Sequence, residues 1–440
     1  MIVNSGMKYD LATNFDTRLL DFIEQHDENH QLVSLFGKLR TDVVGGGRSS
    51  TTLPDITEKQ LAEYNDRCKR MGIRFNYLLN PLCLGNKDVI SSKHKEILRF
   101  LEKLDSLGIE WVTVNSPYLC EIIKRRFPNM KVTIGLYAVI QTVQQAKQWM
   151  DLGADELTLS HDVNRDFDNL RSYLKVFKGT NVNLRLIANN GCLHACPFSI
   201  NHAAGVSHSS TCDGTTTHNY IDYNVMNCYY RKMRNPANLI ASDWIRPEDV
   251  HYYKEICDEI GNQNLVIKLV ERSKSTEFLS NLLDAFLHER YDGNLRELLN
   301  WMDEEQNGKK RIDASGYIKA IEAGELDLRS INNYMKFFSL PDIQIDNKKL
   351  DGFIQHFIND YHCKEKICWM ENEIPKERDD RYCYYCAEWA KKAIQIPNEK
   401  EYTKWKKVAD KLQDNMKSSR MFCVDKKYEE SDKELKRGSI

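Results

Sequence analysis

The sequence predicts an α/β fold, a TIM-like (β/α)8 barrel followed by a mostly helical, cysteine-containing C-terminal extension. Two observations predict the barrel: short apolar runs alternate with segments of helical periodicity, and the connections between them are short. Such a strand–helix repeat implies a parallel sheet. An open doubly wound sheet is the alternative. No Gly-x-Gly-x-x-Gly turn follows the first strand, which disfavours a dinucleotide-binding sheet.

Seven apolar runs are assigned as strands, and helices alternate with most of them. The strands cover residues 31–37, 73–80, 110–115, 131–137, 156–161, 182–188 and 265–272. The helices cover residues 15–25, 54–71, 94–107, 117–127, 143–152, 165–177 and 247–260. A weaker eighth strand is placed at residues 242–245, and closure into an eight-stranded barrel is the preferred interpretation.

The chain is longer than one barrel requires. It has 440 residues, whereas an α/β barrel takes ~250 residues. We assign residues 1–300 to the barrel, residues 301–420 to a helical C-terminal extension and residues 421–440 to a charged tail. Helical periodicity continues after the last strand at residues 276–287 and, more weakly, at residues 314–323.

Polar residues stand where several of the apolar runs stop. On a barrel the carboxyl ends of the strands face one rim, where active sites lie. A single polar residue there is more often a cap or turn residue, but recurrence on five strands favours a site. The candidate catalytic residues are His161, Asn80, Asn115 and Arg272, and the candidate substrate-binding residues are Arg48, Asn189 and Glu271.

Arg48 follows three consecutive glycines at residues 45–47. Glycines allow backbone amides to approach a ligand closely, and an arginine pairs well with a carboxylate or phosphate. The alternative is a surface loop that binds no ligand.

A first group of cysteines lies directly after the strand at residues 182–188. It consists of Cys192, Cys196, Cys212 and Cys228. Thiolates select zinc or iron–sulfur clusters, and dispersed single ligands favour a [4Fe-4S] cluster over zinc. Position 199 is Ser, so the Cys-x-x-x-Cys-x-x-Cys triplet of radical S-adenosylmethionine enzymes is absent. The alternative is that Cys196 or Cys212 is an ordinary buried thiol. Nearby histidines are ligands, proton donors or structural residues, namely His194, His202, His208 and His218.

A second group of cysteines lies in the C-terminal extension. It consists of Cys363, Cys368, Cys383 and Cys386, in the spacing Cys-x4-Cys and Cys-x2-Cys. Two close pairs predict a small metal-stapled module, with either zinc or a second iron–sulfur cluster as the bound group.

Composition restricts the partners. With 62 Lys+Arg against 64 Asp+Glu the net charge is −2, so the basic footprint of a nucleic-acid-binding domain is missing and nucleic acid is an unlikely partner. No apolar run reaches the ~20 residues of a membrane helix, and no signal-peptide pattern is visible. We expect a cytoplasmic protein whose 13 cysteines are mostly reduced.

Several stretches resemble the collagenase-like peptidase family U32. They are residues 11–16, 36–37, 75–80, 85–86, 190–197, 243–249 and 290–295. The family name implies proteolysis. The better understood branches resemble barrel proteins with a [4Fe-4S] cluster on four cysteines that take part in oxygen-independent hydroxylation of RNA bases or of a quinone precursor. Cys192, Cys196 and Cys228 match family-like positions, whereas Cys212 lies in a loop that departs from the family spacing.

The main functional interpretation is therefore an iron–sulfur-dependent oxidoreductase, not of the radical type, that hydroxylates or similarly modifies a small molecule or peptide. An electron-donor protein and a homo- or hetero-oligomeric state are compatible with it. One alternative is a peptidase, although neither a His-Glu-x-x-His helix nor a Gly-x-Ser-x-Gly elbow occurs. A second alternative is an RNA-modifying hydroxylase.

Overall fold

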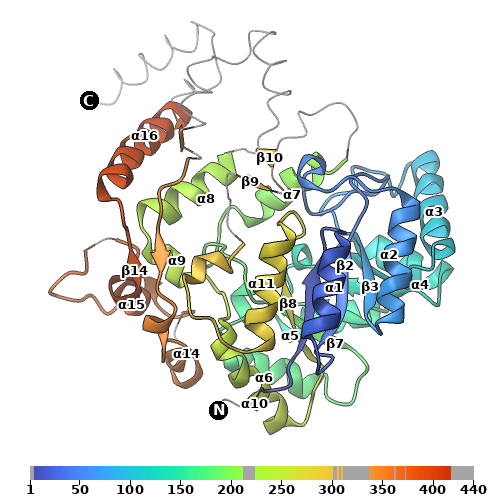
Figure 1. Ribbon diagram of the computed structural model, residues 1–440, viewed down its shortest axis with the longest axis horizontal. Helices are drawn as coiled ribbons and strands as arrows, with labels where there is room; N and C mark the ends of the chain where they lie inside the picture. The colour runs from blue at the N-terminus through green and yellow to red at the C-terminus, as the bar shows by residue number, and fades with distance from the viewer. Residues whose placement is uncertain are drawn as a thin grey trace, which may run out of the picture.

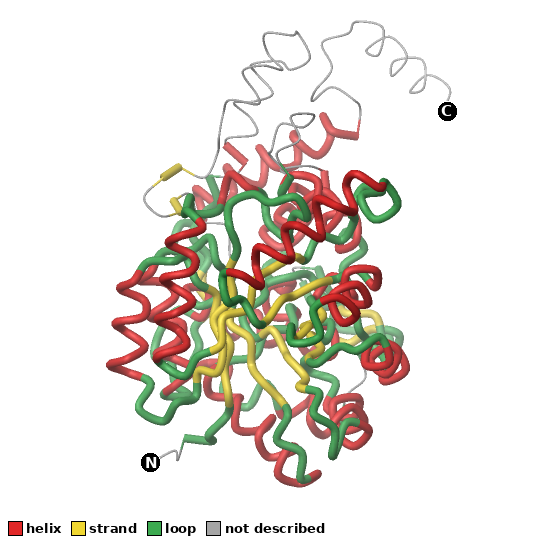
Figure 2. The backbone as a smooth tube through the Cα atoms, turned by 90° about the vertical axis from the view of Figure 1, so that its right-hand side faces the viewer, coloured by secondary structure: helices red, strands yellow, loops and turns green. Residues whose placement is uncertain are grey.

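The computed structural model describes residues 4–211, 223–300, 305–306, 309–310, 336–337, 339–360, 363–371 and 373–417. Its centre is a closed barrel in which eight parallel strands follow one another in sequence order. Figure 2 shows the strands gathered in the middle with helices around them. The predicted (β/α)8 barrel is confirmed.

The barrel strands are short, and each is buried on the side that faces the core. They are β1 Lys8–Ala12, β2 Leu32–Gly37, β3 Arg74–Leu79, β4 Trp111–Val114, β5 Lys131–Ile134, β6 Glu156–Thr158, β7 Asn183–Ile187 and β8 Leu265–Leu269. The barrel closes because β1 pairs with β2 on one side and with β8 on the other, where Leu11 lies opposite Leu269.

One strand was misplaced by the sequence analysis. Residues 242–245 form no strand: Ser242 ends a helix, and Ile245 donates its backbone N–H to the carbonyl of Ala188 at 2.8 Å. The eighth strand is instead β1, which precedes the first predicted helix. Its apolar pattern is interrupted by Asp10, a buried carboxylate 2.6 Å from the guanidinium of Arg185.

Eight helices surround the barrel, and each presents apolar residues to it. They are α1 Thr17–His26, α2 Glu58–Arg70, α3 Ser91–Ser106, α4 Pro117–Arg126, α5 Val143–Asp151, α6 Phe167–Val176, α10 Val250–Ile260 and α11 Thr276–Leu287. The sequence supplies their starts: Thr57 and Gln60 form a reciprocal capping box at α2. The interval between β7 and β8 carries three more helices, α7 Ser199–Ser209, α8 Tyr223–Arg234 and α9 Ala237–Ala241.

The barrel interior is filled by a polar network. Arg185 contacts Asp10 and Glu156, both at 2.6 Å, and Arg74 reaches Glu156 at 2.8 Å. Glu156 also accepts a hydrogen bond from Thr133 at 2.8 Å. Arg74 and Glu156 are the first residues of their strands, so this network closes the end of the barrel opposite the carboxyl ends of the strands.

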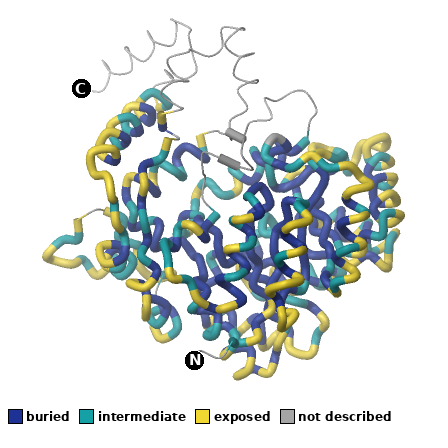
Figure 3. Tube along the Cα trace, viewed as in Figure 1, coloured by how far each residue is buried: buried dark blue, intermediate teal, exposed yellow. Residues whose placement is uncertain are grey.

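The C-terminal extension contains short helices and two-residue strands. The helices are α14 Gln355–Asn359, α15 Tyr385–Ala393 and α16 Glu399–Lys417. The strands are β9 Glu305–Gln306 with β10 Lys309–Lys310, β11 Gln344–Ile345 with β14 Ile394–Gln395, and β12 Ile367–Cys368 with β13 Tyr382–Cys383. Figure 1 shows it on the side of the barrel next to α8 and α9, and Figure 3 shows that it is more exposed than the barrel.

The predicted helix at residues 314–323 and the tail at residues 421–440 lie outside the described residues, and the predicted domain boundaries stay predictions. Of the helices in the described part of the chain, none is long and apolar enough to cross a bilayer.

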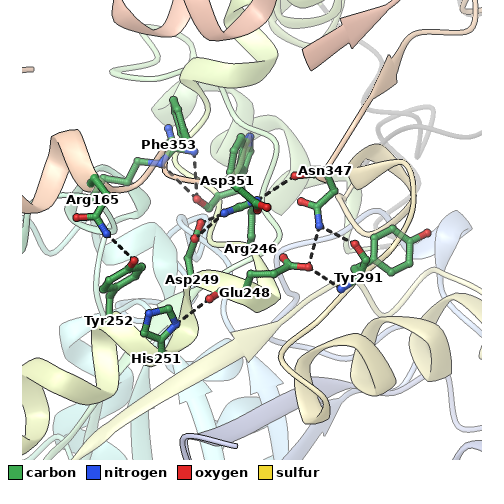
Figure 4. A network of polar contacts seen from close by, with 12 residues as sticks. Arg165, Arg246, Glu248, Asp249, His251, Tyr252, Tyr291, Asn347, Asp351 and Phe353 are labelled. Atoms are coloured by element: carbon green, nitrogen blue, oxygen red, sulfur yellow. Dashed lines mark hydrogen bonds and ion pairs between the residues drawn. The ribbon is translucent and has the colours of Figure 1, made fainter. Parts of the chain in front are cut away.

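A buried arginine attaches the extension to the barrel (Figure 4). The guanidinium of Arg246 binds the carboxylate of Asp249 at 2.8 and 2.9 Å and donates to the carbonyl of Asn347 at 2.9 Å. The Asn347 amide in turn donates to Glu248 at 2.9 Å and to the carbonyl of Tyr291 at 2.7 Å. These contacts fix the extension beside the segment that runs from α9 to α10.

Candidate functional site

A cavity of ≈ 390 Å³ lies at the carboxyl ends of the barrel strands. Its lining includes His161 from the turn after β6, Cys192 from the loop after β7, Glu271 from the turn after β8, and residues of α7 and α8. The position agrees with the rim that the polar strand ends predicted.

Three side chains at this rim form a candidate metal site. His161, Asp162 and Asp243 each offer a ligand atom, and these atoms lie within 4.8 Å of one another. The His161 side chain is only 10% exposed, and neither of its ring nitrogens makes a hydrogen bond within the described residues. A buried imidazole without partners is costly, and one histidine with two carboxylates is a donor set that suits a divalent cation such as zinc.

Hydrogen bonds from the surroundings orient both carboxylates. Asp162 accepts from Ser160 Oγ and Gln141 Nε2, both at 2.9 Å. Asp243 lies 3.0 Å from His194 Nδ1, and the Asp243 carboxylate raises the pKa of His194. Such outer partners fix the direction in which metal ligands point.

Three thiols of the first cysteine group line the same cavity. They are Cys192, Cys196 and Cys228, and Lys232 lies among them. Burial raises the pKa of Cys192 to about 12 and also raises the pKa of Cys196, so these groups are protonated thiols at neutral pH unless a metal displaces the proton. Cys212 lies outside the described residues. The residues fit a thiol-bound metal group, but the [4Fe-4S] cluster stays a prediction.

Arg48 and Glu271 face each other at the rim, as an ion pair that borders the cavity. Arg48 also donates to the carbonyl of Gly47 at 2.7 Å and to the hydroxyl of Tyr137 at 3.2 Å. Burial pushes the pKa of Glu271 upward, but the charges of Arg48 and Arg272 overcome this and hold it below its ordinary value. The rim therefore carries a fixed, ionised pair.

The glycine loop before Arg48 bonds to the protein itself. The amide of Gly46 donates to Ser210 Oγ at 2.8 Å, and the amide of Gly47 donates to Asn80 Oδ1 at 3.1 Å. A Cβ at Gly47 would lie 3.1 Å from the Tyr137 ring, so a larger residue there would require Tyr137 to shift by a few tenths of an ångström. The loop serves to place Arg48 and not to present these amides to a ligand.

The remaining predicted site residues lie around the main cavity without lining it. Asn80 and Arg272 border a second cavity of ≈ 80 Å³. Asn115 donates to the carbonyl of Asn80 at 2.6 Å, and Asn189 accepts from the backbone of Val270 at 2.8 Å. Asn115 and Asn189 therefore hold neighbouring strand ends together. The four C-terminal cysteines also lie away from the main cavity.

Two members of the candidate metal site were missed by the sequence analysis. Asp162 follows His161 directly, so its position after the same strand could have identified it as a site residue. Asp243 comes from the far end of α9, and only the stretch at residues 243–249 drew attention to it. No spacing rule relates Asp243 to His161, because the fold brings them together.

Comparison with known proteins gives one family and one curated relative. A family model described as "Peptidase family U32" matches residues 46–173. The "Uncharacterized protease MJ1657" of Methanocaldococcus jannaschii is 27% identical over 259 residues, which cover 59% of this chain and 73% of that protein.

Comparison with solved structures finds weak likenesses. The structure of the U32 peptidase Mk0906 is 16% identical with a TM-score of 0.42, covering 60% of this chain and 93% of that one. An α-amylase from Lactobacillus plantarum is 9% identical with a TM-score of 0.27, covering 42% of this chain and 63% of that one.

The matches correct the main functional interpretation. An iron–sulfur-dependent oxidoreductase is wrong, because the family model and the curated relative are described as a peptidase and a protease. The RNA-modifying alternative has no support from them either, and the peptidase alternative is the one they favour. By the family-model match over residues 46–173 and the curated relative, this chain is similar to peptidase family U32.

Proposed function

We propose that this protein is an enzyme that hydrolyses peptide bonds at the mouth of its barrel, with a divalent metal ion held by His161, Asp162 and Asp243. The observation that carries the proposal is the buried imidazole of His161, which makes no hydrogen bond within the described residues and lies within 4.8 Å of two carboxylates beside a cavity. The protease description of the curated relative supports the reaction class.

The three side chains have the composition of a catalytic site with an open position. Such a site uses three protein ligands and leaves a further position for water or substrate. A bound divalent ion supplies two effects, since it lowers the pKa of water and polarises the peptide carbonyl. Water adds its oxygen to the carbonyl carbon, the carbon–nitrogen bond breaks, and a proton passes to the departing amine.

The other residues of the cavity bind and orient the peptide. Lys232 is buried at the cavity wall beside Cys192, Cys228 and Tyr229. Its ammonium supplies positive charge for the carbonyl oxygen as that oxygen becomes negative. Arg48 offers donors to a peptide carbonyl or carboxylate at the opposite rim. His194 is a positioning residue that acts through Asp243.

A thiol nucleophile is the competing mechanism within the same reaction class. Cysteine peptidases need a thiolate with a depressed pKa and a base in contact with it. Burial raises the pKa of Cys192 and Cys196 instead. The metal-dependent mechanism therefore accounts better for the cavity.

The test is hydrolysis of a panel of fluorogenic peptides by the purified full-length protein and by His161→Ala. We expect cleavage by the wild-type protein, its loss on chelation, and no recovery of His161→Ala with added zinc or manganese. Cleavage that survives both chelation and His161→Ala would overturn the proposed centre, and absence of cleavage across all peptide classes would overturn the reaction.

The proposal includes a peptide as substrate and not a nucleic acid, consistent with the net charge of −2. It also includes a cytoplasmic location, where the 13 cysteines of the chain would stay reduced.

A further inference from the structure

The second cysteine group forms a compact cluster on the C-terminal extension. Cys368 on β12 pairs in register with Cys383 on β13, and Trp369 donates its backbone N–H to the carbonyl of Cys383 at 2.8 Å. Cys386 stands in the first turn of α15, and its thiol interacts electrostatically with those of Cys363, Cys368 and Cys383. Two chain segments thus bring the four cysteines within electrostatic range of one another.

We propose that Cys363, Cys368, Cys383 and Cys386 bind one structural Zn²⁺ ion. Four thiolates complete the tetrahedral coordination of structural zinc, and a Cys-x2-Cys pair leading into a helix is typical of such sites. The sequence left zinc and a second iron–sulfur cluster open. The in-register pairing of Cys368 with Cys383 places these two cysteines side by side, and the Cys-x2-Cys pair favours the single ion. This site uses ligands different from those of the hydrolytic centre at the barrel mouth, although Asp243 of that centre lies near Cys363 and Cys368.

The local fold has little regular structure of its own, although α15 packs on the core through Ala387, Ala390 and Ala393. Between residues 363 and 396 the regular structure consists of the strands β12, β13 and β14, each of two residues, and the nine-residue helix α15. A segment of this size cannot bury enough apolar surface by itself, and small modules of this kind usually depend on a metal or disulfides. The four cysteines form no disulfide with one another, so their sulfurs are open to a metal ion.

Charged groups of both signs lie near the cluster. Four thiolates and one Zn²⁺ leave a net charge of about −2, which must be balanced if the site is partly buried. Arg165 interacts electrostatically with Cys363 and Cys386, and Lys364 follows Cys363 directly, whereas the carboxylate of Asp243 adds negative charge near Cys363 and Cys368. Lys364 also forms an ion pair with Asp166 of the barrel.

Arg165 links the cluster to the candidate metal site of the barrel. Its guanidinium lies 4.3 Å from the Trp244 ring and 4.9 Å from the Phe353 ring. It donates to the carbonyls of Ile240 and Trp244, both at 3.1 Å, which flank Asp243 in the chain. Zinc binding in the extension would therefore stiffen the segment that presents Asp243, as a positioning effect.

The first test measures which cysteines the native full-length protein protects. We expect the four C-terminal cysteines to resist N-ethylmaleimide, as read by peptide mass spectrometry, until zinc is removed by a strong chelator. The exposed Cys83 provides the control, because it should react before and after chelation. Equal labelling of the four cysteines in both states would overturn the proposal.

The second test measures the metal directly. In a His161→Ala background, which removes the barrel ion from the count, we expect about one zinc per chain. The ratio should be unchanged in Cys83→Ser and should fall at least fivefold in Cys383→Ser/Cys386→Ser. The assignment would be overturned if the double variant retained its zinc. It would also be overturned if the double substitution removed iron and acid-labile sulfide and left the zinc content unchanged.

Discussion

The barrel mouth and the C-terminal cysteine cluster are both rich in metal-binding side chains, yet they differ in access. His161, Asp162 and the thiols of Cys192, Cys196 and Cys228 face a cavity of ≈ 390 Å³. The C-terminal thiols instead pack between two short strands, a helix and the side of the barrel. Catalytic metal sites keep an open position, whereas structural sites are closed by four protein ligands. The difference assigns chemistry to the first region and stability to the second.

The largest effect is expected at the open site. Asp243→Asn removes a charged ligand while keeping the hydrogen-bonding shape, so peptide hydrolysis should fall by at least about 100-fold. The measurement is kcat/KM together with the thermal unfolding temperature. Asp168→Asn is the matched control, because that side chain is 89% exposed and lies in the neighbouring helix α6.

An equal loss of activity in Asp168→Asn would show that the assay responds to any change of surface charge. Full activity in Asp243→Asn would remove that residue from the site.

A substitution between the two regions should affect stability more than chemistry. Arg165→Met leaves the carbonyls of Ile240 and Trp244 without their donor, so we expect a loss of about 3 kcal/mol in the free energy of unfolding. Limited proteolysis should then cut the C-terminal extension before the barrel. Unchanged unfolding in denaturant would contradict the proposed link between the regions.

The Arg48–Glu271 pair should give a smaller effect that depends on pH. Two arginines hold the folded-state pKa of Glu271 below its ordinary value of 4.5, so the pair stabilises the protein above pH 4.5 and loses this contribution as the pH falls through the lower folded-state value. In Arg48→Gln the pKa of Glu271 rises, so stability is lower at pH 7 and acid unfolding begins at a higher pH.

The measurement for this pair is the unfolding temperature from pH 3 to pH 7 and the KM for peptides. We expect a rise in KM of roughly tenfold, from the lost charge-assisted hydrogen bond. Identical pH profiles for the wild-type protein and Arg48→Gln would mean that the pair does not form in solution.

The smallest effect is expected for the barrel thiols. Because burial raises the pKa of Cys192 to about 12, only roughly one thiol in 10⁵ is ionised at pH 7. Iodoacetamide should therefore change hydrolysis less than about twofold while Cys83 is modified. Rapid inactivation that follows modification of Cys192, Cys196 or Cys228 would instead support a thiol nucleophile.

Much of the barrel could be predicted from the sequence, because buried parallel strands appear in it as short apolar runs. β1 was not recognised, because Asp10 interrupts its apolar run. The charge of Asp10 is balanced by Arg185, which lies in a strand distant in sequence. Residues 242–245 were assigned in its place, and Trp244 and Ile245 of that segment are buried in the structure. Their burial comes from the packing of an irregular segment and not from a strand ladder.

The site could be predicted only in part. His161 was found from its position after a strand. Three of the four predicted cluster cysteines lie in the described residues, and all three line the cavity. Asn115 and Asn189 looked the same in sequence, but their amides bind backbone groups at strand ends. Whether a polar residue at a strand end faces a cavity or a neighbouring turn depends on loop packing, which no local pattern encodes.

The most direct test of the open site is a metal titration of hydrolysis. The protein is stripped by a chelator, and activity is followed as zinc or manganese is added to the Cys383→Ser/Cys386→Ser variant, which lacks the C-terminal ion. The account predicts no hydrolysis in the stripped protein and recovery that saturates at about one ion per chain, and neither binding nor recovery in Asp243→Asn. Undiminished hydrolysis by the stripped protein would contradict it.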